Sequence, residues 1–117
     1  MSRTKTFALP AEKIVRLVPP QGHCFATDMI TVHGRMVGYM YRESPDNDSD
    51  SGWRFFAGDE AQEYIDDPEN LNLYDVNTIV NYDREIIPYL AEPIGSAYER
   101  DTTSGAFRKV QPPRTEE

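Results

Sequence analysis

The chain has one cysteine, Cys24, among its 117 residues. An intramolecular disulfide and a cysteine-rich metal site are therefore excluded. No stretch approaches the ~20 consecutive apolar residues of a membrane-spanning helix. The N-terminal run MSRTKTFALPAEK is polar where a secretory signal needs an apolar core. We therefore expect a cytoplasmic protein that does not interact with membranes.

Motifs of known reaction centres are also missing. The chain has no GxSxG, Walker or dinucleotide-binding pattern. His23, Cys24 and His33 are close in sequence, but a strand would point His23 and Cys24 to opposite faces, which disfavours a zinc site. We expect no catalytic residue, no cofactor and no bound metal.

Positive charge is scarce. Lys and Arg number 12 against 20 Asp and Glu, which gives a net charge of -8. A field of that sign repels nucleic acid and anionic membranes and favours a basic partner. Acidity also keeps proteins soluble without selecting any partner, so net charge alone leaves both explanations open.

One group of acids lies in the polar stretch Ser44 to Ser51. Asp46, Asp48 and Asp50 have the spacing of the first ligands in a calcium loop. The sixth and twelfth positions of such a loop hold Gly and Glu, whereas this chain has Ser51 and Ala57 there. A solvated acidic loop is the better interpretation.

A second group of acids surrounds a predicted short helix and comprises Asp59, Glu60, Glu63, Asp66 and Asp67. Individually, these residues suit a helix N-terminus and a solvated helix face. Acid–base catalysis would need a pocket that separates their pKa values, and nothing in the sequence indicates one. As a group they predict an electronegative patch that can steer a basic partner.

The most distinctive run is GWRFFAGDE, from Gly52 to Glu60, which contains the only tryptophan. Side chains alternate along a strand, so Trp53 and Phe55 share one face while Arg54 and Phe56 share the other. Such a strand is either covered on both faces or presents one aromatic face to a partner.

Periodicity predicts an α+β fold: one domain with an antiparallel sheet of about four to five strands and short helices packed on one face. The boundaries that we expect are a leader and short helix over 1–21, the domain over 22–110 and a disordered tail over 111–117. The expected strands comprise a hairpin of 23–29 with 36–43, a third strand at 52–57 that makes a meander, and strands near 97–100 and 106–110, the last at an edge.

The expected helices follow apolar spacing and capping residues. One spans Pro10 to Val18, and a second is capped by Asp59. Two more lie between residues 75 and 90, separated near Asp83, which caps the second of them; Pro88 should distort that helix.

Four segments together resemble a known family: DMITVHGRMVGYMYRESPD, DSGWRFFAGDEAQEYIDDPEN, LYDVNTIVNYD and IGSAYERD. The family comprises small bacterial proteins first catalogued as a domain of unknown function. It is now grouped with the immunity proteins of polymorphic-toxin systems, as the thirty-third such family. The resemblance covers roughly Gly22 to Asp101, and Ala57 stands where the family usually has Ser.

The resemblance implies a cytosolic, non-enzymatic binding protein that neutralises a cognate toxin by covering its active site or an essential surface. We expect the toxin to be basic. The hypothesised partner-binding residues are Trp53, Arg54, Asp59, Glu60, Tyr64, Asp66 and Asp67. The alternatives are a stand-alone regulatory or ligand-binding module without a toxin and, more remotely, a hydrolase that uses the acids around Asp59. The oligomeric state stays open.

Overall fold

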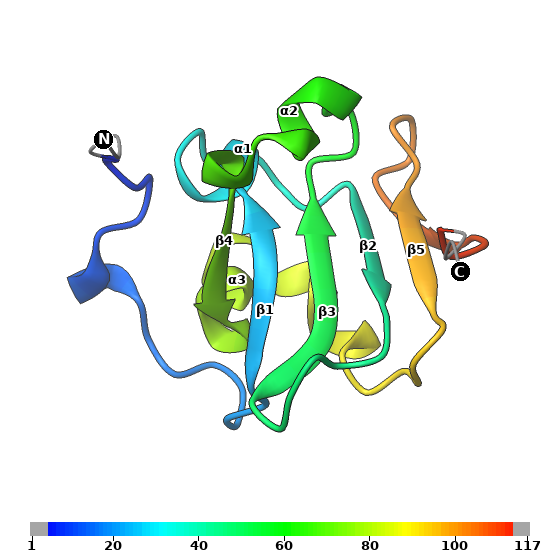
Figure 1. Cartoon of the computed structure of the whole chain (residues 1–117), viewed down its shortest axis with the longest axis horizontal. Helices are drawn as coiled ribbons and strands as arrows, with labels where there is room; N and C mark the ends of the chain where they lie inside the picture. Colours follow the sequence, from blue (N-terminus) through cyan, green and yellow to red (C-terminus); the bar gives the residue numbers. More distant parts are fainter. Residues whose placement is uncertain (1–4, 114–117) are drawn as a thin grey trace.

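Six strands form one sheet in the computed structural model, which describes residues 5–113 (Figure 1). The sheet order is β4-β1-β3-β2-β5-β6, and every neighbouring pair is antiparallel except β1 with β3, which is parallel. The bounds are β1 His23–Thr27, β2 Tyr39–Arg42, β3 Asp50–Phe56, β4 Leu71–Asp75, β5 Ala97–Arg100 and β6 Phe107–Lys109. The α+β class is confirmed, with slightly more strands than predicted.

Within residues 5–113 the helices are short and leave one face of the sheet without a helical layer. They are α1 Asp28–Thr31, α2 Gln62–Asp66 and α3 Val76–Tyr82, with 3-10 turns η1 Ala11–Lys13, η2 Pro68–Asn70 and η3 Arg84–Tyr89. In Figure 1, α3 lies behind the sheet, while α1 and α2 lie at the end where β1 and β3 terminate. Within residues 5–113 no helix is long and apolar enough to cross a bilayer.

The core lies between the sheet and the layer formed by α3 and η3. The largest side chain in it is Trp53, whose indole N–H donates to the carbonyl of Leu90 at 3.2 Å. This bond satisfies the one polar group of the ring, so its full burial leaves no donor without a partner. The other fully buried large apolar side chains are Ile30, Val37, Met40, Phe55, Val76, Ile79, Val80 and Ile86.

Gly52, which opens the tryptophan motif, is required by backbone geometry. Its φ is +89°, and a Cβ on it would lie 2.3 Å from the carbonyl oxygen of Glu43. That separation is below van der Waals contact, and the positive φ strains any L side chain. The backbone N–H of Glu43 donates to the carbonyl of Gly52 at 2.9 Å, so the chain after β2 lies directly against the start of β3.

The predicted hairpin between residues 23–29 and 36–43, and the meander built on it, are wrong. The first strand ends at Thr27, because residues 28–31 form a helical turn in which the N–H of Val32 donates to the carbonyl of Asp28. The turn sends the chain away from β1, and β3 occupies the position between β1 and β2. Alternation alone predicts strands but carries no information on which strands pair.

The predicted helix over Pro10–Val18 is also wrong, since only the single turn η1 forms. Extended backbone follows, and side-chain amides of α3 bond to it. Oδ1 of Asn77 accepts the N–H groups of Leu17 and Val18, and Oδ1 of Asn81 accepts that of Val15. These bonds replace the intrahelical ones that the apolar spacing had suggested.

The predicted cap at Asp59 is wrong as well. Helix α2 begins at Gln62, and its N-cap is Ala61, with no side-chain cap bond. The carboxylate of Asp59 instead accepts two bonds from the guanidinium of Arg35, at 2.8 and 3.0 Å. Asp59 therefore pairs with Arg35, which is distant in sequence, and does not cap α2.

The C-terminal third agrees better with the sequence. Asp83 separates α3 from η3 and caps the latter by accepting the N–H of Glu85, and Pro88 lies inside η3, which is a 3-10 helix. Strand β5 and the edge strand β6 form as predicted, while β4 was not anticipated. Residues 111–113 have no regular structure, and the rest of the predicted tail and the first four residues lie outside the described range.

Candidate partner-binding face

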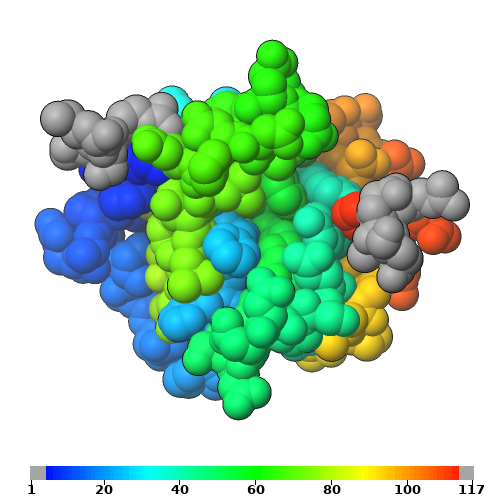
Figure 2. All heavy atoms as spheres, in the orientation of Figure 1, coloured from blue at the N-terminus to red at the C-terminus, as the bar shows by residue number. Residues whose placement is uncertain are grey.

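The face of the sheet opposite α3 and η3 carries a row of aromatic side chains around one arginine. Register places Phe25 beside Arg54, with Tyr41 opposite Arg54 and Tyr39 opposite Phe56. Leu73 of β4 lies opposite Phe25. We call this set the outer face: Phe25, Tyr39, Tyr41, Arg54, Phe56 and Leu73. Figure 2 shows it from the front, with α2 projecting at the upper rim and the β2–β3 loop at the lower rim.

Three rings of the outer face touch one another. Tyr41 stacks on Phe56 with centroids 5.9 Å apart, and Tyr39 lies 6.0 Å from Phe56 and 5.8 Å from Tyr41. Both tyrosines are half-buried. Burial raises the pKa of each phenol, to which Glu99 adds at Tyr39 and Glu43 at Tyr41. At neutral pH the phenols are protonated, and each can donate a hydrogen bond to a partner.

Arg54 is held in the middle of the outer face by two carboxylates and a ring. Its Nη1 and Nη2 donate to the two oxygens of Asp50 at 2.9 Å each, and its Nε donates to Glu43 at 2.6 Å. The guanidinium carbon lies 5.0 Å from the Phe25 centroid. Only 4% of the residue is exposed. Paired in this way, Arg54 forms a rigid base for the aromatic surface.

The electrostatics of this network hold Asp50 ionised. The hydrogen bonds from Arg54 lower the pKa of the Asp50 carboxyl well below its usual range, against the opposing effect of burial. The backbone N–H groups of Asp46 and Gly52 also donate to it. Asp50 is therefore committed to Arg54 and to its own loop rather than to an ion. No cluster of three or more His, Cys, Asp or Glu able to hold a metal is found within residues 5–113.

The upper rim contains the predicted acidic residues in two different roles. Glu60 is structural, because its carboxylate accepts the hydroxyl of Thr27 at 2.7 Å and the N–H groups of Ala57 and Gly58 at 2.7 and 2.9 Å. It thereby ties the end of β3 to β1. Asp59 is exposed and paired with Arg35, whose hydrogen bond lowers the pKa of that carboxyl.

The remaining predicted residues of the rim lie on or next to α2. Asp66 and Asp67 are both exposed, and Tyr64 is half-buried. The side-chain amide of Gln62 donates to Asp66 at 2.9 Å, and Asp67 accepts the N–H of Glu69 at the start of η2. Each carboxylate keeps an open side toward solvent, so this rim is electronegative and accessible.

Trp53 does not join the other predicted residues. It is 0% exposed and points into the core, so it supports the surface from beneath and we leave it out of the face that a partner would touch. Arg54 belongs to the outer face, whereas Asp59, Glu60, Tyr64, Asp66 and Asp67 belong to the rim. The hypothesis that these residues bind a partner stays a prediction.

Sequence reasoning missed five members of the outer face: Phe25, Tyr39, Tyr41, Phe56 and Leu73. A signal for Tyr39 and Tyr41 was present, since they occur two residues apart in a β-prone run and so share one face of a strand. The same alternation places the side chain of Phe25 on the face opposite to that of buried Cys24. The sequence did not reveal which face of the sheet the helices cover. Leu73 was missed because β4 itself was missed.

Cys24 lies on the inner face, fully buried. Burial raises the pKa of its thiol strongly, and the nearby carboxylate of Asp75 adds to the effect. A thiol that stays protonated is neither a nucleophile nor a metal ligand. Cys24 thus acts as a small apolar side chain of the core.

Comparison with known proteins gives one informative result. The family model described as "Immunity protein Imm33 domain" matches residues 24–111. No curated protein and no solved structure matches the chain significantly.

Proposed function

Because the chain belongs to the Imm33 family of immunity proteins, we propose that it neutralises a cognate toxin by binding it through the outer face, without catalysis, in the cytoplasm. The observation that carries the proposal is the contrast between the two faces. One is sealed by α3 and η3, while the other presents touching aromatic rings on a rigid base. Aromatic side chains in such a setting are typical anchors of protein interfaces.

The rims favour a basic toxin. Glu43 and the exposed acids Asp46 and Asp48 lie in or beside the lower loop, and Asp66 and Asp67 lie at the upper rim. With a net charge of -8, these groups attract a cationic surface and orient it over the rings between them. Electrostatic complementarity of this kind acts mainly on the association rate.

The first experiment captures the partner and tests toxicity. The tagged protein is incubated at physiological salt with lysate of its source organism, and a retained protein is then expressed alone and together with the chain. A retained protein that stops growth alone, and not in co-expression, supports the proposal. If the folded bait retains nothing, or retains a harmless protein, the immunity mechanism is overturned in favour of a stand-alone module.

Variants then locate the binding surface on the folded protein. Replacing both Tyr39 and Tyr41 with Ala should weaken toxin binding about a hundredfold or more, because two aromatic anchors are lost. The matched control is Ile87→Ala, which removes an exposed apolar side chain from η3. Equal effects of the two changes would contradict the placement of the interface on the outer face.

Charge reversal tests the role of the upper rim. Asp66→Lys together with Asp67→Lys should slow association and flatten its dependence on salt, while dissociation changes little. Glu12→Lys in η1 is the control, since Glu12 is also an exposed acid and is far from α2 along the chain. Unchanged association rates and salt dependence would remove the upper rim from the interface.

A further inference from the structure

Among the described residues, 5–113, strand β4 is one of the two edges of the sheet, and no other strand covers its free side. In an antiparallel pair, opposite residues alternate between those that exchange backbone hydrogen bonds and those whose N–H and C=O point away. The backbone N–H of Val76 donates to the carbonyl of Gly22 at 3.1 Å, one step beyond the pairing of His23 with Asp75. Hydrogen-bonded positions recur every second residue, so the backbone N–H and C=O groups of Asn72 and Tyr74 point toward β1.

Leu71 and Leu73 consequently turn their backbone groups toward the free edge. Within residues 5–113 the register gives Leu73 no backbone bond to β1, and no backbone group of a turn or loop bonds to it. The side chain of Leu73 is 54% exposed, an unusual condition for a leucine at the centre of a strand. The edge therefore offers both unpaired backbone groups and apolar surface.

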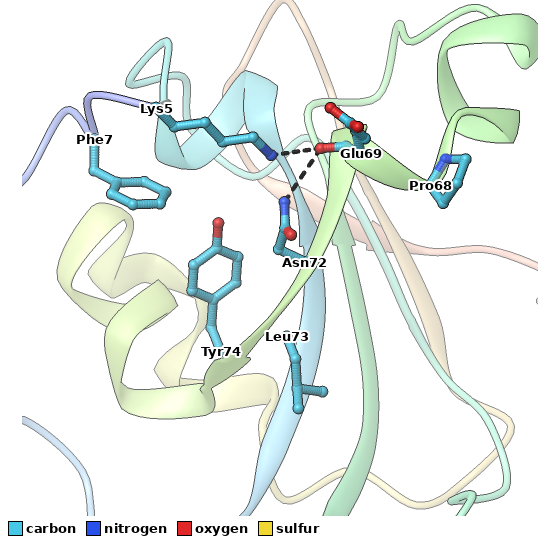
Figure 3. A pocket seen from close by; sticks show the side chains of 7 residues that line it. All are labelled: Lys5, Phe7, Pro68, Glu69, Asn72, Leu73 and Tyr74. Atoms are coloured by element: carbon cyan, nitrogen blue, oxygen red, sulfur yellow. Dashed lines mark hydrogen bonds between the residues drawn. The ribbon is translucent and has the colours of Figure 1, made fainter. Parts of the chain in front are cut away.

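A hollow of about 580 Å³ runs along this edge. Figure 3 shows Lys5 and Phe7 across from β4, with Tyr74 between Phe7 and the strand. Phe7 meets Tyr74 edge-on at 6.2 Å, and Lys5 is fixed by its ion pair with Asp28 at 3.0 Å. The wall of the hollow across from β4 therefore has an apolar part, where Phe7 packs on Tyr74, and a part held in place by the ion pair of Lys5 with Asp28.

The opposite edge of the sheet is built differently. Strand β6 has only three residues, Phe107–Lys109, and two of them are cationic. By the same alternation, starting from the bond between the N–H of Val110 and the carbonyl of Ala97, Phe107 and Lys109 face outward there. Short length and lysine are the usual means of discouraging strand addition. Strand β4 has neither protection.

We propose that the free edge of β4 receives an extended, basic segment of a partner protein, which adds to the sheet as a further strand. Its backbone would pair with Leu71 and Leu73, and its alternate side chains would lie over Leu73 and in the hollow beside Phe7. Basic residues are favoured because Lys5 is paired with Asp28, while two further carboxylates lie nearby: Asp67, next to Pro68 of the hollow, and Asp75, the last residue of the strand. The inference rests on the proposed function only for calling the partner a toxin.

The test uses a probe that does not require the toxin. A displayed library of random peptides is selected for binding to the full chain, and the affinity of the enriched peptides is then measured for the full chain and for the variant Leu73→Pro. This change removes the outward N–H but no bond to β1, and edge strands tolerate proline. Peptides that alternate apolar residues with Lys or Arg should be enriched, and their affinity should fall about threefold to tenfold on Leu73→Pro, as for one lost hydrogen bond.

Two controls separate edge pairing from other binding. Lys109→Pro removes an outward N–H from β6 and should leave peptide affinity unchanged. Amide exchange followed by NMR should show new protection at Leu71 and Leu73 in the peptide complex. Failure to enrich any peptide, equal effects of the two prolines, or no protection on β4 would each overturn the proposal. Dimerisation through β4 in sedimentation would overturn it in favour of a second copy of this chain.

These outcomes are independent of toxin neutralisation. Peptide binding at β4 with no toxin recovered would leave the edge proposal standing and remove the proposed function. A toxin that the chain neutralises, with no peptide enriched on β4, would keep the proposed function and remove the edge proposal.

Discussion

The inner and outer faces of strand β3 carry similar side chains in opposite settings. Trp53 and Phe55 point into a helical layer and are completely buried, whereas Arg54 and Phe56 point to a face that has no such layer. The outer side chains reach low exposure through one another and through acids of the neighbouring loop. The inner face therefore stabilises the fold by burial, and the outer face does so by a rigid network that is also available to a partner.

The largest effect should follow from breaking the inner face. Trp53→Ala removes the largest buried side chain and leaves the carbonyl of Leu90 without its donor, so we expect a loss of about 3–5 kcal/mol in the free energy of unfolding. Urea denaturation followed by circular dichroism measures it. A loss below about 1 kcal/mol would show that the helical layer collapses into the cavity. The inner face would then not depend on the burial of Trp53 for its stability.

Breaking the central pair of the outer face should cost somewhat less. Arg54→Met leaves the carboxylate of Asp50 buried without its cation, and we expect a loss of about 3 kcal/mol. The double change Arg54→Met and Asp50→Asn should recover part of that loss, because no unpaired charge remains. Urea denaturation measures the losses. If the loss of unfolding free energy in the double variant equalled the sum of the losses in Arg54→Met and Asp50→Asn, the two residues would not act as a pair.

Acid should test the outer face directly, because the guanidinium of Arg54 is paired there with the carboxylate of Asp50, whose side chain is 4% exposed. The pKa of Asp50 is lowered on folding, so its contribution is complete above its unfolded pKa of about 3.9 and is lost as pH falls through the folded value. Arg54 stays protonated throughout. The stability difference between the native chain and Asp50→Asn should therefore shrink as pH is lowered from about 5 to 2. A constant difference would contradict the assignment.

The smallest effect on stability should come from the rings at the surface. Tyr41→Ala removes a half-buried side chain and its stack on Phe56, for which we expect about 1 kcal/mol. Urea denaturation of this variant beside Trp53→Ala gives the comparison directly. Equal losses from the two changes would show that the outer rings are structural core rather than a surface kept for binding.

Sequence reasoning recovered part of the local structure and missed the pairing. Alternation correctly separated Trp53 and Phe55 from Arg54 and Phe56, and turn and capping residues correctly marked Asp83 and the last two strands. It missed the parallel pairing of β1 with β3, because the helical turn at residues 28–31 interrupts a run that reads as strand. It missed β4 because the segment Leu71–Asp75 mixes leucines with Asn72 and Asp75, which are poor strand formers.

The candidate site could be predicted only in part, for a related reason. The acids of the upper rim were predicted as a group, and most of them are exposed. The roles of Glu60 and Asp59 depend on Thr27 and Arg35, which are distant in sequence, and no local pattern reveals such partners. Similarly, Trp53 was among the hypothesised partner-binding residues although its strand could equally be covered on both faces, and the placement of α3 and η3 decides its burial.

The order of elements along the chain also bears on synthesis at the ribosome. Strands β1, β2 and β3, with Trp53 and Phe55, leave the exit tunnel before α3 and η3, which cover those rings in the finished core. A nascent chain that ends before residue 76 therefore shows its indole face to solvent while its outer face can already assemble from β1 to β3. We expect that stage to be the one at which the growing chain needs protection from aggregation.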